Sequence, residues 1–272
     1  MLKARVITAL VMLVVFSTAL FGFSPAGWML FVAVIAGFGG WEWGALCRWS
    51  GNPRIAYGVG AALLVGLLAW AAGLLSEVPS RAALVLCFGV AAAFWLCLGF
   101  VWLARRWPLG SGVPAAVCGL IVLLPTALAM IFLRGIDPLW LLAAMALVWV
   151  ADIAAYFTGR AFGRCKLAPA ISPGKSWEGV YGAGVAVCMY GMAILSFSGL
   201  DLSAVQWLGA LLALLVLTGI SVAGDLFESM LKRQAGIKDS SALLPGHGGI
   251  LDRIDSLTST LPLVALLAAV LA

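Results

Sequence analysis

Runs of about 20 apolar residues recur along the whole chain, and this feature restricts its fold more than any other. Each run is long enough to cross a hydrocarbon core of about 30 Å as a helix. The runs are continuous rather than alternating, which favours helices over a β-barrel. Only 10% of the 272 residues are charged, whereas soluble domains carry about 25%. The sequence therefore predicts an all-α polytopic membrane protein.

Nine membrane-spanning helices are predicted, separated by short connectors that contain proline, glycine or serine. No internal repeat and no linker marks a second domain, so residues 1–272 are interpreted as one integral-membrane domain. Residues 1–135 are expected to form mainly scaffold helices, and residues 136–272 the catalytic portion. The predicted spans are 5–23, 27–47, 55–75, 82–103, 112–133, 138–159, 178–198, 205–226 and 252–271.

The basic residues predict how the chain is oriented in the membrane. If the N-terminus is cytoplasmic, all 16 Lys and Arg residues except Arg81, Arg134 and Arg253 fall in cytoplasmic segments. The positive-inside rule therefore places the N-terminus in the cytoplasm and the C-terminus outside, in a bacterial-type inner membrane. Two long loops, 160–177 and 227–251, would face the cytoplasm. The first run is interpreted as a span rather than a signal peptide, because no small-residue cleavage site follows it.

Two kinds of partner or ligand are disfavoured by the same residues. The basic residues stand singly or in pairs at segment ends and form no stripe, so no nucleic-acid partner is predicted despite the net charge of +5. The six cysteines form no CxxC pair and lie mostly in apolar runs, so they are interpreted as small buried hydrophobic residues rather than a disulfide or zinc framework.

Acidic residues are concentrated where a membrane protein least tolerates them. Eight of the eleven lie between Asp152 and Asp255, and five of these fall in or beside predicted spans. A carboxylate at that depth costs at least about 2.5 kcal/mol. A single one is often solvated at the interface or paired with a basic residue. That explanation is weaker for five carboxylates from three segments, namely Asp152, Asp225, Glu228, Asp252 and Asp255.

The spacing of these carboxylates favours a bound cation. Asp225 and Glu228 are three residues apart, as are Asp252 and Asp255, so each pair lies on one helix face. Two facing acidic pairs repel each other unless a cation lies between them. Hard oxygen ligands suit Mg²⁺, which uses one or two carboxylates together with water and substrate phosphates.

Basic residues near the same segments point to phosphate chemistry, because metal and cations together can share the charge of a polyphosphate. The sequence Pro245-Gly246-His247-Gly248-Gly249 predicts a turn with close backbone approach, with N–H groups directed at an anion. His247, the only histidine, is expected to orient this loop or bind a phosphate rather than act as a base. The basic residues are Lys175, Lys232, Arg233, Lys238 and Arg253.

Gly174-Lys175-Ser176 resembles the end of a P-loop, but proline occupies position 169, where that motif needs glycine. Lys175 is instead interpreted as a phosphate-contacting cation on a loop. Ser176 and Glu178 are expected to start the helix that follows.

The stretch from Ser229 to Asp255, SMLKRQAGIKDSSALLPGHGGILDRID, resembles the signature of phosphatidate cytidylyltransferases, also called CDP-diacylglycerol synthases. Upstream, Asp152 with Tyr156 and Gly159, the loop from Ser172 to Gly179, and Gly224-Asp225-Leu226 are also similar to that family. The first 130 or so residues match only in character. The chain departs at Gly174, where many members have a second lysine, and at Ser176, where threonine is usual.

The resemblance implies that CTP and phosphatidic acid react at the membrane to give CDP-diacylglycerol and pyrophosphate. It also implies a requirement for Mg²⁺, a second, monovalent cation such as K⁺, and a homodimer. The expected catalytic residues are Lys175, Asp225, Lys232, Arg233, Asp252 and Arg253, with Asp225, Asp252 and Asp255 as metal ligands. Substrate-binding residues would be Ser172, Lys175, Ser229, Lys238, Asp239, His247, Gly248 and Gly249, supported by Asp152, Tyr156, Glu178 and Glu228.

Two competing functions remain open from the sequence. A CTP-dependent lipid kinase, or a cytidylyltransferase acting on an ether or isoprenoid phospholipid, would need a similar set of residues. A secondary transporter would use intramembrane carboxylates as an ion site, but it predicts inverted repeats. The polar residues here are confined to one half of the chain, and no repeat is visible.

Overall fold

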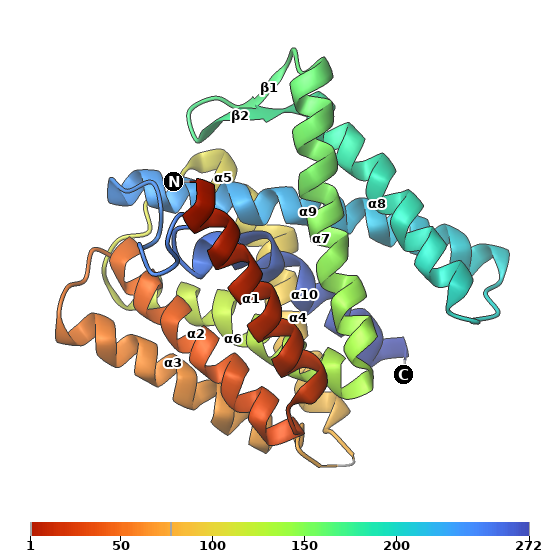
Figure 1. Ribbon diagram of the computed structural model, residues 1–272, viewed down its shortest axis with the longest axis horizontal. Coiled ribbons are helices and arrows are strands. Elements are labelled where there is room, and N and C mark those ends of the chain that lie inside the picture. The colour runs from red at the N-terminus through yellow and green to blue at the C-terminus, as the bar shows by residue number, and fades with distance from the viewer. Residues whose placement is uncertain (1, 77, 272) are drawn as a thin grey trace.

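The computed structural model describes residues 2–76 and 78–271, with side chains from Arg5 onward, and it is built almost entirely from helices (Figure 1). In this part of the chain, nine helical segments are long and apolar enough to cross a membrane. One of them is composite, because α4, the π-helical turn η1 and α5 run on without a break. The elements are α1 (Leu2–Gly22), α2 (Pro25–Leu46), α3 (Asn52–Ala71), α4 (Arg81–Ala93), η1 (Phe94–Gly99), α5 (Phe100–Arg105), α6 (Val113–Ile136), α7 (Pro138–Phe162), β1 (Lys166–Ala168), β2 (Ser172–Ser176), α8 (Trp177–Phe197), α9 (Ala204–Ala235) and α10 (Leu251–Leu271).

The structure confirms the nine predicted spans and an all-α polytopic membrane protein. One boundary was wrong by nine residues. Helix α9 does not end at residue 226 but continues to Ala235, so the predicted loop 227–251 is shorter at its start. No glycine or proline interrupts residues 225–235, and Glu228 pairs with Lys232 one turn later, at 3.1 Å. The helix stops at Gly236, which adopts the left-handed conformation with φ 78°.

The other long loop contains a small β-hairpin that the sequence analysis did not predict. Strands β1 and β2 pair antiparallel between the end of α7 and the start of α8 (Figure 1). Ser176 ends the hairpin and begins α8, because its hydroxyl oxygen accepts from the amide of Gly179 at 3.3 Å. The predicted role of Ser176 at a helix start is therefore confirmed.

The loops group into two ends of the helix bundle, as the alternation of spans requires. At one end, the guanidinium of Arg48 donates to the carbonyl of Gln234 at 2.5 Å, and the hydroxyl of Thr8 donates to the carbonyl of Pro245 at 3.0 Å. At the other end, Arg134 donates to the carbonyl of Leu20 at 2.9 Å. Segments predicted to share a side of the membrane thus meet in space.

Close packing of α9 on α10 determines where the acidic residues meet. A Cβ atom at Gly224 would lie 3.0 Å from the carbonyl oxygen of Asp255 and even closer to the hydroxyl of Ser259. The Ser259 hydroxyl donates to the carbonyl of Ile220 at 2.9 Å. Glycine and serine therefore let the two helices approach closely, as small residues do in membrane bundles. This contact lies one residue from Asp225, and it brings that carboxylate toward α10.

Candidate active site

A polar centre lies where α7, α9, α10 and the β-hairpin converge. Its most direct contact joins Lys175 of β2 to Asp225 of α9, with Nζ 2.5 Å from Oδ2 and both side chains about one quarter exposed, at 25% and 26%. The hydroxyl of Ser229 donates to the other oxygen of Asp225 at 3.2 Å. Asp152 and Asp255, from α7 and α10, both interact electrostatically with Asp225. Carboxylates from three helices therefore come together at the partly exposed Lys175–Asp225 pair.

A second, buried group of charges lies beside this centre. Nζ of Lys232 is 2.6 Å from Oδ1 of Asp252 and 3.1 Å from Oε1 of Glu228, and all three side chains are less than 10% exposed. A lysine is rarely buried unless it is paired. Here one cation faces two carboxylates, so Lys232 is held in place from α9 and α10 at once. The expected supporting role of Glu228 agrees with this geometry.

The second oxygen of Asp252 holds the signature loop, which comprises residues 236–250. It accepts hydrogen bonds from the amides of Ser240 and Gly249, both at 2.8 Å, and from the Ser240 hydroxyl at 2.9 Å. Both carboxylate oxygens of Asp252 are thus used by protein donors. The expected turn with N–H groups directed at an anion is present, but the anion is this internal carboxylate.

The glycines of the signature loop are required by its backbone and by close approach. Gly246 and Gly248 have φ 76° and 79°, which non-glycine residues rarely adopt. A Cβ atom at Gly249 would collide with the Ser240 hydroxyl and with the carboxylate of Glu42. His247, the residue between these glycines, is half-buried, and its Nδ1 has no hydrogen-bond partner in the described structure.

Gly249→Ala tests how tightly this loop is packed. We expect the variant to lose about 1–3 kcal/mol of stability, because the added methyl group must displace Ser240 or Glu42. The midpoint of thermal unfolding in detergent measures this loss. Gly135→Ala is a matched control, because a Cβ there meets nothing within 4 Å in α6. An unchanged midpoint in Gly249→Ala would show that the loop yields freely.

Several expected site residues lie apart from these two groups. The Tyr156 hydroxyl accepts from Arg160 at 3.1 Å, on the exposed side of α7. Glu178, in the first turn of α8, accepts from the amide of Cys165 at 3.1 Å and so stabilises the base of the hairpin. No side-chain contact joins Ser172 to the centre in the described residues. Arg233, Lys238 and Asp239 are exposed, and no ion pair engages them in the described part of the chain. Arg253 is also exposed and forms no ion pair there, but its charge acts on Asp152 and so belongs beside the polar centre.

Glu42, in the middle of the N-terminal half, was missed by the sequence analysis. Its carboxylate is fully buried and accepts hydrogen bonds from the signature loop and from the start of α10. The signal was present, because a carboxylate within the predicted span 27–47 is as costly there as in the later helices.

The polar centre fits a magnesium ion only as a partly open site. In residues 2–76 and 78–271, no three Asp, Glu, His or Cys side chains are placed to enclose a metal. Magnesium commonly uses one or two carboxylates and completes its shell with water and substrate phosphates. Asp225 and Asp255 satisfy that smaller requirement, because their charges interact where α9 packs closely on α10 at Gly224.

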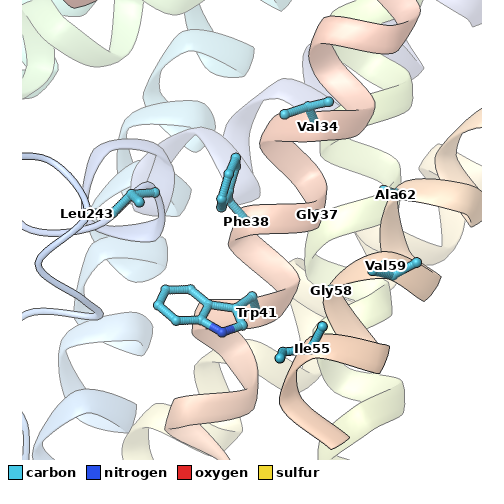
Figure 2. A pocket seen from close by; sticks show the side chains of 9 residues that line it. All are labelled: Val34, Gly37, Phe38, Trp41, Ile55, Gly58, Val59, Ala62 and Leu243. Atoms are coloured by element: carbon cyan, nitrogen blue, oxygen red, sulfur yellow. The ribbon is translucent and has the colours of Figure 1, made fainter. Parts of the chain in front are cut away.

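An apolar groove of about 400 Å³ lies outside the polar centre, between α2 and α3. Figure 2 shows Leu243 of the signature loop on one side of it, across from Phe38 and Trp41 of α2. Its lining contains no charged side chain, so this groove offers no group for phosphate chemistry. The lining residues are Val34, Gly37, Phe38, Trp41, Ile55, Gly58, Val59, Ala62 and Leu243.

Comparison with known proteins identifies relatives along the whole chain. The sequence model of the cytidylyltransferase family matches residues 3–271. The chain is 44% identical to a phosphatidate cytidylyltransferase of Pseudomonas aeruginosa, with 98% of this chain and 97% of that protein covered. It is 37% identical to a phosphatidate cytidylyltransferase of Haemophilus influenzae, with 96% of each chain covered. The matches thus include both the apolar helices and the polar centre.

Proposed function

The chain belongs to the cytidylyltransferase family, and we propose that its polar centre transfers the cytidylyl group of CTP to phosphatidic acid. An oxygen of the lipid's phosphate monoester forms a bond to the α-phosphorus of CTP. The bond from that phosphorus to the oxygen bridging to the β-phosphate breaks, and pyrophosphate leaves. The product is CDP-diacylglycerol, and the reaction belongs to phospholipid biosynthesis. The protein is a multi-pass membrane protein, so it lies in the same membrane as its lipid substrate.

The observation that carries this proposal is the meeting of exposed and buried cations around carboxylates where three membrane helices converge. Both substrates are ionised phosphates, so the transfer needs positioning and charge stabilisation more than a general base. Lys175 is about one quarter exposed and can turn from Asp225 to a phosphate oxygen. Arg233, Lys238 and Arg253 are exposed cations for the triphosphate. Lys232 is fixed in the buried group and supplies a stationary positive charge.

The proposal includes Mg²⁺ as a cofactor and a second, monovalent cation such as K⁺. Asp225 and Asp255 would hold the magnesium ion, with Asp252 joining them if it releases one of its present donors. When bound, Mg²⁺ supplies positive charge against the phosphates of the substrates. The pairing of Asp225 with the partly exposed Lys175, beside Asp255, supports this part of the proposal.

We also propose that the polar centre faces the cytoplasm, where CTP is available, and that the protein is a homodimer. The orientation is supported by the excess of Lys and Arg in loops at the end where the signature loop lies. The homodimer is supported by the family resemblance alone. Residues 136–272 would then carry the chemistry, with residues 1–135 as the supporting helices.

The test is a labelled-nucleotide assay with the purified protein, phosphatidic acid and CTP. We expect label from the α-phosphate of CTP to enter the lipid, while label from the γ-phosphate leaves as pyrophosphate. Removing Mg²⁺ with EDTA should lower the rate by at least about 100-fold, because the negative charge of the phosphates is then no longer neutralised. Adding Mg²⁺ back should restore the rate.

Other experimental outcomes would change the proposed function or its cofactor. Transfer of the γ-phosphate to the lipid would identify a CTP-dependent lipid kinase. In a separate transport assay, uptake of a solute into proteoliposomes without any nucleotide would identify a transporter. Full activity in EDTA would reject the metal while leaving cytidylyl transfer in place.

A further inference from the structure

Glu42 of α2 is a fully buried carboxylate with 0% of its surface exposed. It lies between two tryptophans in a helix that is otherwise apolar over most of its length. An ionised carboxylate in such a place is costly unless hydrogen-bond donors satisfy its oxygens. The hydrogen-bond donors around Glu42 therefore indicate which part of the structure it stabilises.

Four donors converge on this carboxylate. Oε1 accepts from the hydroxyl of Ser241 at 2.6 Å and from the amide of Ile250 at 3.0 Å. Oε2 accepts from the amide of Leu251 at 2.7 Å and from the hydroxyl of Ser240 at 3.0 Å. An ionised carboxylate offers about four acceptor positions, so a donor lies within reach of each of them. All four donors belong to the signature loop or to the first residue of α10, about 200 residues later in the chain.

Glu42 is linked through Ser240 to the buried charges beside the polar centre. The Ser240 hydroxyl lies between two carboxylates, 3.0 Å from Glu42 and 2.9 Å from Asp252. Its single hydrogen can serve only one of them at a time, so both acids share one donor. Asp252 in turn holds Lys232 at 2.6 Å. A change at Glu42 therefore reaches Lys232 through three successive contacts, by way of Ser240 and Asp252.

The position of Glu42 at the start of α10 adds a second effect. The amides of Ile250 and Leu251 stand at the N-terminus of this helix, where unpaired N–H groups and the helix dipole favour an anion. Glu42 supplies that anion from another helix, as an N-cap residue normally does from within the same chain segment. The end of α10 that bears Asp252 and Asp255 is thereby fixed to α2.

We infer that Glu42 is a positioning residue for cytidylyl transfer, acting through the signature loop on Asp252 and Lys232. The inference rests on the proposed function. It assigns a specific role to the N-terminal half of the chain, which would otherwise be only a scaffold. Among the described residues, Glu42 makes no hydrogen bond or ion pair with Lys175 or Asp225, so its effect on the reaction is indirect.

The test compares Glu42→Gln with the native protein in the CTP and phosphatidic acid assay. Glutamine has nearly the same shape but no charge. Its NH₂ group replaces one acceptor oxygen and would face hydrogen-bond donors with which it cannot pair. We expect kcat to fall by about 10–100-fold, the range for groups that orient a site from behind. The KM for CTP should rise as well, because the loop that carries Lys238 and His247 is released.

The rise in KM separates positioning from loss of folded protein. Fewer folded molecules lower the apparent kcat but leave the KM for CTP unchanged. Asp137→Asn is the matched control, since Asp137 accepts from the amide of Leu139 at 2.6 Å at the opposite end of the bundle. It should change neither constant by more than about twofold, because asparagine also serves as an N-cap.

Ser241→Ala provides a second variant in case Glu42→Gln does not fold. It removes one donor from Oε1 and leaves the other three, so we expect the same change in kcat and KM at smaller size. Native kinetic constants in either variant, purified as a folded protein, would overturn the inference. Absence of cytidylyl transfer in the native protein would instead reject the proposed function.

Discussion

Lys232→Met should destabilise the protein by about 3–5 kcal/mol and abolish most of its cytidylyl transfer. The loss of stability follows because Glu228 and Asp252 would remain buried without their shared cation, and breaking a buried ion pair from one side costs about that much. The loss of activity follows because a stationary positive charge beside the phosphates disappears. We expect kcat to fall by at least about 100-fold, as when one preorganised charge-stabilising group is removed.

A double variant separates these two effects. Adding Glu228→Gln to Lys232→Met removes one of the two uncompensated carboxylates, so part of the lost stability should return. Activity should not return, since the positive charge is still missing. Thermal unfolding in detergent measures the first effect, and the labelled-CTP assay measures the second. If Lys232→Met alone had the same unfolding midpoint as the native protein, the stability of the buried group would not depend on the charge of Lys232.

The spans were predictable because their cause is local. Each span needs only enough consecutive apolar residues to cross the hydrocarbon core, and that requirement is visible in any window of the sequence. The end of α9 was not predictable in the same way. Hydropathy falls after Leu226, although the helix continues to Ala235 through a stretch in which Glu228 and Lys232 pair with each other and Lys232 also pairs with Asp252 of α10.

The polar centre was predictable in its members more than in its arrangement. The acidic and basic residues stood out because charge is expensive in a membrane. Which carboxylate meets which cation depends on contacts between distant segments, such as Gly224 against α10 and Glu42 against Ser241. No sequence window contains both members of those pairs.

Asp252 was correctly expected to be a charged residue of the buried region, but its contacts could not be predicted from the sequence. The sequence analysis expected it to bind metal, yet its oxygens are occupied by Lys232, Ser240 and Gly249. Asp225 has the opposite character. It is more exposed, and its partners are the accessible lysine Lys175 and the hydroxyl of Ser229. The more freely available carboxylate is the better candidate for direct metal contact.

Asp225→Asn should therefore lower kcat by about 1,000-fold with little loss of stability. Asparagine is neutral and a poorer ligand for a hard cation, so charge stabilisation at the α-phosphorus is weakened. Stability should change by no more than about 1 kcal/mol, because the Lys175–Asp225 pair is partly exposed and such pairs contribute little. Asp201→Asn, in the exposed connection between α8 and α9, serves as the matched control and should behave like the native protein.

The value of kcat and the Mg²⁺ requirement discriminate between two roles of Asp225. In both roles the variant removes a negative charge near the triphosphate and frees Lys175, so CTP should bind no more weakly than before. If Asp225 holds magnesium, kcat falls steeply and more Mg²⁺ is needed for half-maximal rate. If Asp225 serves only as the counter-ion of Lys175, binding tightens while kcat and the Mg²⁺ requirement stay as they were. The second pattern would remove Asp225 from the proposed metal site and leave Asp255 as its remaining uncommitted carboxylate.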